Sequence, residues 1–477
     1  MSDLTALSAC ELSRAIHTGQ VSCREVMSAY LDRIDRLNPQ VNAIVNLQPR
    51  ALLLAEADTR DAQLATGHSQ GWMQGFPMAI KDLAETAGVP TTYGWPVLAR
   101  HQPADCTMVA RMKAAGGIVI GKTNTPEFGF GSHTSNRLFG DTRNPWDLTR
   151  SAGGSSGGSA VSLALRLQPV ADGSDMMGSL RNPAAFNNVF GFRPSPGRVP
   201  RASAPEAFLS QLSTEGPMAR HVGDLAMLLS VQAGRDDRAP LSLPGDGSEF
   251  AQSLVSDDAR HMRIGWLGSL DGHLLMEPGI LDVCDSALGR LSSLGCHVEP
   301  VSLGFSTEVV WQSWLTLRQW ASAGLLNAMA PDAPRREQLN EAARWELAQG
   351  EKLSAREVLK ASQQRTAFYR HLLKLFERFD VLALPSAQVW PFALDNGMPQ
   401  QINGQPLDTY HRWMEVVVCA SLAGLPTVNV PAGFNPQGLP MGLQLMGKPQ
   451  ADLSVLQLAA AFETTISDLL ARQPSLS

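Results

Sequence analysis

Short, almost wholly apolar runs alternate along this chain with longer segments of helical character. The apolar runs read FPMAI (76–80), IVIGK (118–122), PVADG (169–173), MRIGWLG (262–268), CHVEPV (296–301), DVLALP (380–385), TVNVPAG (427–433) and MGLQLMG (441–447). Runs of this length are typical of strands buried on both faces. Between them, residues 107–117, 160–167 and 278–295 read as helices. The alternation predicts an α/β protein, a single large α/β/α layered domain with a mostly mixed central sheet and helices on both faces.

Two further helical regions accompany this pattern. Ser22 and Glu25 form an S-x-x-E capping box, and apolar residues then recur at helical spacing. We therefore expect N-terminal helices within residues 1–70. Residues 305–378 also have helical character and contain four tryptophans, Trp311, Trp314, Trp320 and Trp345. We expect this segment to form a helical cap within one domain that spans 1–477.

Charge and composition argue against several classes of protein. The formal net charge is −6 without a basic stripe, so no nucleic-acid partner is expected. No stretch of about eighteen apolar residues occurs, so we expect no transmembrane helix and no membrane partner. The six cysteines lie far apart and the N-terminus lacks a secretory pattern, which favours reduced thiols in the cytoplasm. Cysteine and histidine show no metal-ligand spacing, so we expect no metal and no cofactor.

The stretch SAGGSSGGSA (151–160) contains four glycines and four serines, a composition typical of a flexible linker. GGSSG (153–157) also satisfies the G-x-S-x-G expression of a nucleophile elbow, for which His133 would be the nearest base. An elbow directly follows an apolar strand, whereas the polar segment RNPWDLTRSA, which contains Pro145, precedes this one. A Ser-His-Asp esterase of the α/β-hydrolase type therefore stays an alternative.

A second motif, GGIVIGKT (116–123), satisfies the P-loop expression G-x-x-x-x-G-K-[ST]. In a P-loop the glycine-rich segment follows a strand, so that its free amides can wrap the phosphates. Here Ile118, Val119 and Ile120 fill the loop positions and favour a strand themselves. We therefore interpret Lys122 as part of a strand and not as a phosphate ligand.

Blocks of sequence between residues 77 and 449 share the pattern of one known family. They are PMAIKDLAETAGVPTTYG (77–94), GKTNTPEFGFGS (121–132), RNPWD (143–147), AGGSSGGSA (152–160), DGSDMMGSLRNPAAFNNVFGFRPSPGRVP (172–200), GPMAR (216–220), ASLAGLPTVNVPAGF (420–434) and GLPMGLQLMGKP (438–449). These blocks resemble the amidase signature family, with residues 71–230 as its signature core. The resemblance implies a cofactor-free hydrolase that cleaves amide-type C–N bonds of small molecules.

The resemblance also implies a catalytic set. The family's lysine falls on Lys81, its middle serine, which follows a cis peptide bond, on Ser155, and its nucleophile on Ser179. Ser179 follows Ser155 by 24 positions, which is the spacing of the family motif. Ser156 is adjacent and is the main rival for the middle role.

Residues around the implied nucleophile would complete the site. The family forms its oxyanion hole from the backbone N–H groups just before the nucleophile, which are here those of Met176, Met177 and Gly178. The N–H of the nucleophilic serine itself could join them. Asp175 and Arg181 flank this segment and would form an ion pair of structural character.

This chemistry needs a neutral lysine. A serine hydroxyl is a weak nucleophile and needs a base within hydrogen-bond reach. Burial would lower the pKa of Lys81 and make it such a base. Lys81 directly follows the apolar run FPMAI, which favours burial, whereas the neighbouring Asp82 would raise that pKa if it faced the amine. An acyl-enzyme on Ser179 would follow, which water then hydrolyses.

The chain departs from the family at the implied oxyanion hole. It has M-M-G-S where the family usually has T-G-G-S, so Met177 stands where a glycine is common. A methionine would be strained at positive φ, so either the backbone is ordinary there or the donors differ.

Met176, Met177 and the tryptophan-bearing segment favour apolar or aryl amides, anilides or carbamates (urethanes) as substrates. The family also includes one component of a tRNA-dependent amidotransferase, and this alternative and a homodimer both stay open.

Overall fold

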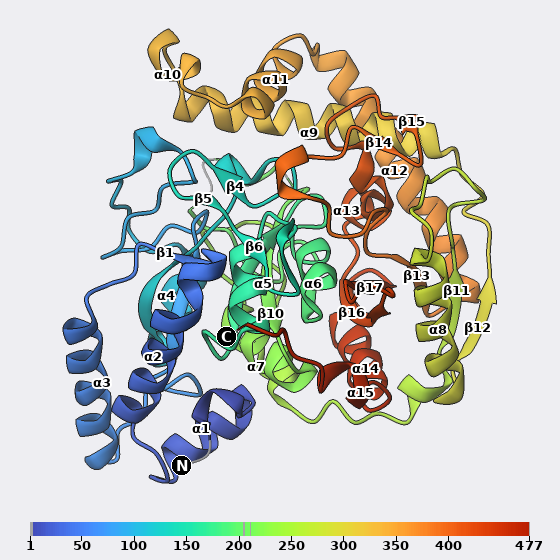
Figure 1. The fold of residues 1–477 in the computed structure, drawn as a ribbon. Coiled ribbons are helices and arrows are strands. Elements are labelled where there is room, and N and C mark those ends of the chain that lie inside the picture. The colour runs from blue at the N-terminus through green and yellow to red at the C-terminus, as the bar shows by residue number, and fades with distance from the viewer. Residues whose placement is uncertain (1–2, 204–205, 210, 477) are drawn as a thin grey trace.

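In the computed structural model, residues 3–203, 206–209 and 211–476 are described, and they form a mixed eight-stranded sheet through the centre of the molecule (Figure 1). The strand order is β12-β11-β13-β17-β16-β9-β10-β8. In chain order these strands are β8 (Ala171–Asp175), β9 (Phe190–Arg193), β10 (Thr214–Ala219), β11 (Arg263–Trp266), β12 (His297–Pro300), β13 (Val381–Pro385), β16 (Thr427–Phe434) and β17 (Pro440–Gly447). β11 pairs in parallel with β12 and β13, and the other neighbours pair antiparallel.

A smaller sheet in the described chain holds the N-terminal strands. Its order is β1 (Ile44–Val45), β3 (Ile118–Thr123) and β2 (Pro77–Lys81), with β2 and β3 parallel. β2 lies against β8, so the two sheets meet at this edge. Three short hairpins lie outside the two sheets: β4 (Ser135–Asn136) with β5 (Gly140–Asp141), β6 (Arg143–Asn144) with β7 (Asp147–Ser151), and β14 (Gln401–Ile402) with β15 (Gln405–Pro406).

Helices cover both faces of the large sheet. Val381 and Ala383 of β13 pack into one hydrophobic cluster, with α7 (Val222–Gln232), α8 (Ile280–Ser293) and α14 (Asp452–Glu463). Leu382 and Leu384 pack into the other, with α6 (Asn182–Asn187), α12 (Ala355–Arg378) and α13 (Val418–Ala423). Because successive side chains of a strand point to opposite faces, β13 is buried on both sides. The predicted α/β/α layering with a mixed sheet is confirmed.

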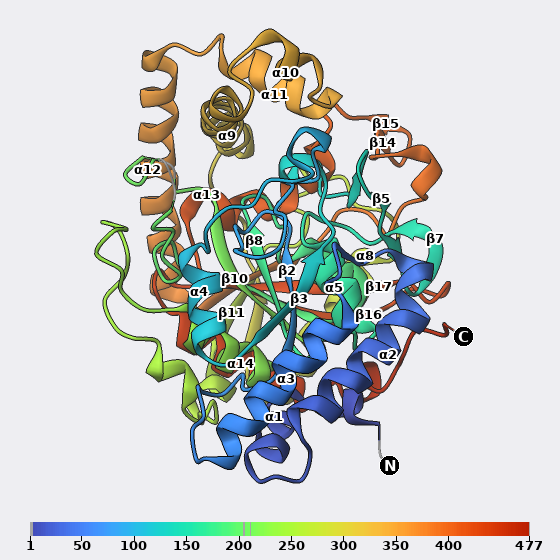
Figure 2. The ribbon, with the colours of Figure 1, turned by 90° about the vertical axis from the view of Figure 1, so that its left-hand side faces the viewer.

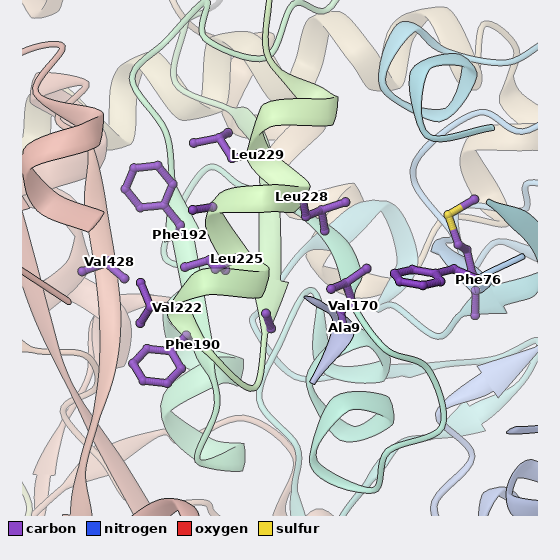
Figure 3. Packing of buried hydrophobic residues seen from close by; sticks show 14 of the residues in the cluster. Ala9, Phe76, Val170, Phe190, Phe192, Val222, Leu225, Leu228, Leu229 and Val428 are labelled. Carbon is purple, nitrogen blue, oxygen red and sulfur yellow. The ribbon is translucent and has the colours of Figure 1, made fainter. Parts of the chain in front are cut away.

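The packing of α7 shows how a helix fits this sheet. Val222, Leu225 and Leu229 follow one another at three- and four-residue spacing, so they share one face of the helix. That face lies over Phe190 and Phe192, which point the same way from β9 (Figure 3). The contact covers β9 and the neighbouring β10 with apolar side chains.

Two further groups of helices lie at the two ends of the molecule. α1 (Ala9–His17), α2 (Cys23–Val41) and α3 (Arg50–Ala65) lie toward one end, and the predicted capping box of Ser22 and Glu25 begins α2. α9 (Thr307–Met329), α10 (Ala333–Glu337) and α11 (Glu341–Gly350) lie across the other end (Figures 1 and 2). α9 packs on both α11 and α12, so the predicted helical segment 305–378 is one connected group of helices.

Some elements differ from the sequence prediction. The helix expected over 160–167 is α5 (Gly157–Ala164), which begins directly after the serine pair, while α4 (Thr107–Ala114) and the short α15 (Ser467–Leu470) complete the helices. α8 begins at Ile280 after Gly279 with φ 85°, so Pro278 lies outside the helix. Strands β9 and β10 are missing from the prediction. No helix in the described part of the chain is both long and apolar enough to cross a membrane.

Candidate active site

A cavity of about 480 Å³ opens where the edge of the two sheets meets α9. Figure 2 shows β2, β8 and α5 grouped together, with α9 at the end of the molecule nearest them. The polar residues of its wall include Lys81, Ser155, Ser174, Ser179, Glu85, Asp172, Glu215, Arg201 and Arg318, and the apolar ones Phe128, Phe130, Met176, Met177, Trp320 and Met414. The sequence-predicted lysine and two of the predicted serines therefore line one cavity.

Lys81 is the last residue of β2 and its side chain is 1% exposed. Its Nζ lies 2.8 Å from Ser155 Oγ, 2.8 Å from Ser156 Oγ and 3.0 Å from Ser174 Oγ. A fourth oxygen, the carbonyl of Ser174, accepts from Nζ at 3.3 Å. Since a carbonyl can only accept, a neutral amine can donate to it and still take a hydroxyl proton on its lone pair.

Burial lowers the pKa of Lys81 to about 7, because the ammonium form loses its water. Asp172 opposes this shift, but its carboxylate accepts from the backbone N–H of Lys81 at 3.0 Å and not from the amine. Asp82 points elsewhere and accepts from the N–H of Thr92 at 2.9 Å. The amine therefore has no carboxylate partner in the described structure.

The glycine- and serine-rich stretch is a buried turn, not a flexible linker. Ser155 and Ser156 lie between β7 and α5, and the peptide bond Gly154–Ser155 is cis. A Cβ at Gly158 would lie 2.4 Å from the backbone nitrogen of Asn124, so only glycine permits this close approach. Ser155 borders the cavity, whereas Ser156 is 0% exposed and does not line it.

Ser179 follows β8, lines the cavity, and is 7% exposed. Met176 and Met177 both avoid positive φ, so the backbone is ordinary where the family resemblance suggested strain. Gly178 adopts φ 78° and a Cβ there would lie 2.9 Å from both methyl groups of Val417.

The backbone N–H groups of residues 176–179 differ in whether they already have a hydrogen-bond acceptor. That of Gly178 donates to Asp175 Oδ1 at 2.9 Å, so it is already occupied and does not fit the predicted oxyanion role. Those of Met176, Met177 and Ser179 donate to no acceptor among the described residues. The sequence could not show that this N–H group is occupied, because the turn after β8 brings the Asp175 carboxylate to Gly178.

Asp175 and Arg181 form a bidentate pair, with Nε and Nη2 both 3.0 Å from the carboxylate oxygens. Arg193 adds a third contact at 3.2 Å, and all three side chains are fully buried. Burial alone would raise the pKa of Asp175, but the two guanidinium groups outweigh it and hold the pKa well below its usual range. The cluster fixes the segment that precedes Ser179.

Neither competing motif has the structure that its function requires. Lys122 is part of β3, and its Nζ is buried against the carbonyl of Ala84 (2.7 Å) and the hydroxyl of Thr86 (2.8 Å). Because Ile118–Thr123 is a strand, no P-loop is present there. His133 contacts Ser151 Oγ at 2.9 Å and does not reach Ser155, so the elbow hypothesis lacks its base.

Ser174 and Arg318 line the cavity but were not predicted from the sequence, whereas Trp320 belongs to the tryptophan-bearing segment that was expected to contact substrate. Strand alternation could have found Ser174, since it and Asp172 share one face of β8 beside Lys81. Arg318 and Trp320 lie on α9, far along the chain, and only the tryptophans of this segment suggested a role. Trp311 and Trp314 are fully buried in the core and do not line the cavity.

Comparison with known proteins gives consistent matches. A family model described as amidase matches residues 25–456. A glutamyl-tRNA(Gln) amidotransferase component from Acidothermus cellulolyticus is 34% identical over 497 aligned positions, which cover 99% of this chain and 97% of that protein. An acylamidase of Rhodococcus erythropolis is 31% identical over 470, covering 96% and 95%. The solved structure of a bacterial aryl acylamidase of the amidase signature enzymes matches with a TM-score of 0.89 at 31% identity, covering 98% of this chain and 99% of that one.

The layered α/β fold and the comparisons together define a hydrolase of amide bonds. The chain belongs to the amidase family, among the amidase signature enzymes, and it is an amidase. The resemblance drawn from its sequence blocks is confirmed.

Proposed function

We propose that the enzyme hydrolyses amides through an acyl-enzyme on Ser179, with Lys81 as base and Ser155 as proton relay. The observation that supports this most directly is the placement of Lys81 Nζ, buried and 2.8 Å from Ser155 Oγ, at the cavity that Ser179 also lines. A lysine with a pKa of about 7 is half neutral near physiological pH and can accept a proton.

The reaction would proceed in two halves. Neutral Lys81 takes the proton of Ser155, Ser155 takes that of Ser179, and the Ser179 oxygen attacks the carbonyl carbon. As the C–N bond breaks, the same chain returns a proton to the leaving amine. Water then loses a proton to the relay, attacks the acyl carbon and releases the acid, which restores the Ser179 hydroxyl.

The developing oxyanion needs N–H donors that no protein acceptor has taken. The N–H groups of Met176, Met177 and Ser179 meet this condition in the described structure, and that of Gly178 does not. We therefore assign the oxyanion hole to the first three groups.

The apolar wall of the cavity favours an aromatic or apolar substrate, such as an anilide, aryl amide or carbamate. Phe128, Phe130 and Trp320 line it together with Met176 and Met177. An acylamidase and an aryl acylamidase among the similar proteins support the same class. Since α9 supplies Trp320 and lines the cavity, we keep residues 305–378 as a cap over the site.

A hydrolysis assay tests this proposal. Wild-type enzyme should release para-nitroaniline from para-nitroacetanilide, while Ser179→Ala should lose this activity and keep its circular dichroism spectrum. Ser156→Ala, which alters a hydroxyl that does not border the cavity, serves as the matched control and should keep more activity than Ser155→Ala. Equal activity of Ser179→Ala and wild type would refute the proposal.

A second candidate function is that of an amidotransferase component, which the identity of 34% to such a protein supports. An enzyme with this role would release ammonia from glutamine and would depend on partner chains. Ammonia release from glutamine without turnover of anilides would favour it over the proposed function.

A further inference from the structure

A buried arginine on α9 faces the cavity without taking part in the proposed chemistry. Arg318 is 4% exposed and lines the same cavity as Ser155 and Ser179. A charged side chain this deeply buried is costly unless every donor is satisfied. The partners of its guanidinium group therefore indicate what else it can bind.

One edge of the guanidinium group is held by the protein. Nε donates to Glu346 Oε1 of α11 at 2.6 Å, and Nη2 donates to the hydroxyl of Tyr410 at 2.9 Å. The faces are covered as well, because the rings of Phe130 and Trp314 each lie 5.3 Å from its central carbon. Arg318 is thus fixed in one orientation before any substrate arrives.

The other edge of the group is poorly satisfied. Nη1 has a thioether as its acceptor among the described residues, Met176 Sδ at 3.6 Å, which is a weak hydrogen-bond partner. Met176 itself lines the cavity and lies three positions before Ser179. When an apolar substrate displaces water from the cavity, this N–H edge loses its solvent and needs an oxygen in return.

We propose that Arg318 is a specificity-determining residue that binds an uncharged acceptor oxygen, such as a ketone or second amide carbonyl, on the part of the substrate away from the scissile bond. The inference rests on the proposed amidase function and names its substrate class more closely. The acceptor is uncharged because Glu346, fully buried, already balances the guanidinium charge. A substrate carboxylate would leave a net negative charge in a dry site.

Matched substrates that differ by one group test this assignment. At the acyl end, the first pair is the para-nitroanilides of levulinic and pentanoic acid, in which a ketone carbonyl of the former replaces a methylene of the latter. The third member is the para-nitroanilide of succinic acid, in which a carboxylate oxygen replaces the methyl group of the levulinoyl chain. At the amine end, the pentanoyl amides of para-acetylaniline, para-ethylaniline and para-aminobenzoate form the equivalent series. Testing both ends covers either orientation of the substrate.

The variant that removes the donor must not leave a bare buried charge. Arg318→Met alone would strand Glu346, so it is combined with Glu346→Gln. The matched control is Arg412→Met, because Arg412 also covers a tryptophan ring, that of Trp311 at 4.1 Å, but does not line the cavity. Thermal unfolding of each variant checks that it is folded.

In the wild type, kcat/KM should favour the ketone over the methylene member of at least one pair by about tenfold or more. The double variant should reduce this preference to within about twofold, mainly through KM, and Arg412→Met should keep it. A wild type without the preference, a double variant that retains it, or a preference for the carboxylate members would overturn the inference.

The failure of the inference and that of the amidase function are separable. Calorimetric binding of the same six compounds to Ser179→Ala, and to Ser179→Ala combined with the double variant, measures the preference without any turnover. If the wild type shows no turnover but binding of the ketone members still depends on Arg318, the mechanism is refuted and the subsite is supported. Equal binding of ketone and methylene members would refute the subsite even where turnover is normal.

Discussion

Two buried lysines illustrate how a residue's surroundings decide its chemistry. The amine of Lys81 contacts three serine hydroxyls beside the cavity. The amine of Lys122 contacts a carbonyl and two threonine hydroxyls in the core. Burial lowers the pKa of both, to about 7 and about 8. Only the first has a hydroxyl in the cavity to which it can pass a proton, so only the first can act on a substrate.

Lys81→Met should therefore lower kcat by about 10²–10⁴-fold, the usual contribution of a general base, while the protein stays folded. Lys122→Met is the matched control. It should keep the proton relay intact but lower the free energy of unfolding by about 1–3 kcal/mol, because its buried acceptors lose their donor. Anilide kinetics and urea unfolding measure the two effects. Full turnover in Lys81→Met would remove the base from the mechanism.

The pKa of Lys81 also sets the pH dependence. The base must be neutral. Because the pKa of Lys81 is about 7, the amine is protonated at lower pH, so activity is lost as pH falls. We expect kcat/KM to decrease about tenfold per pH unit below this value and to level off above it. Initial rates between mildly acidic and alkaline pH check this. A profile that is flat through neutrality would show that another group is the base.

At this scale the sequence motif identified Lys81, Ser155 and Ser179 as neighbours, and the structure places all three at one cavity. It could not show which N–H groups are free, because that depends on where the Asp175 carboxylate lies after the turn. It could not place Arg318 either, since α9 meets Met176 only in the folded chain.

The two parts of helix α9 have different surroundings. Trp311 and Trp314 are fully buried in the core beside His411, whereas Trp320 lines the cavity. The N-terminal part of this helix therefore packs into the core, and the part from Arg318 onward lines the cavity. This division could not be predicted from composition, because tryptophan favours core and binding sites alike.

Trp320→Ala and Trp314→Ala should separate these roles. Trp320→Ala should raise KM for anilides by about tenfold through lost apolar contact, with little change in thermal stability. Trp314→Ala should instead lower the free energy of unfolding by about 3–5 kcal/mol, the cost of a large core cavity. Anilide kinetics give KM for both variants, and urea unfolding gives their free energies of unfolding. Unchanged KM in Trp320→Ala would place the substrate away from α9.

The strands that prediction missed share a physical cause. β9 reads FGFR and β10 reads TEGPMA, so glycine, proline and charge interrupt the apolar pattern expected of a central strand. Arg193 is tolerated in β9 because it pairs with Asp175, and Gly216 in β10 because Phe192 O would lie 2.4 Å from a Cβ there. Tertiary contacts, which no local pattern contains, make these segments strands.

Over the whole molecule, the alternation of apolar runs and helices was enough to predict the layered α/β fold. The alternation could not predict where the two sheets meet, since Lys81 of β2 and Asp172 of β8, which contact each other there, are 91 positions apart in the chain. The cavity lies at this junction, and residues of α9 line part of it.

Because the described lining of the cavity comes from one chain, we predict that the enzyme needs no partner for anilide hydrolysis. On size-exclusion chromatography, anilide activity should co-elute with the purified chain, whether it runs as a monomer or as a homodimer. The described residues supply every group of the proposed site, so adding a cell extract should not raise kcat. Activity that appears only with added extract would favour the amidotransferase function.

The central claim is that Ser179 is an activated nucleophile, and the intact mass after treatment with a fluorophosphonate tests it most directly. Wild type should gain the mass of one adduct, Ser179→Ala should gain none, and Lys81→Met should react far more slowly. An adduct that persists in Ser179→Ala would move the nucleophile to another serine and contradict the mechanism.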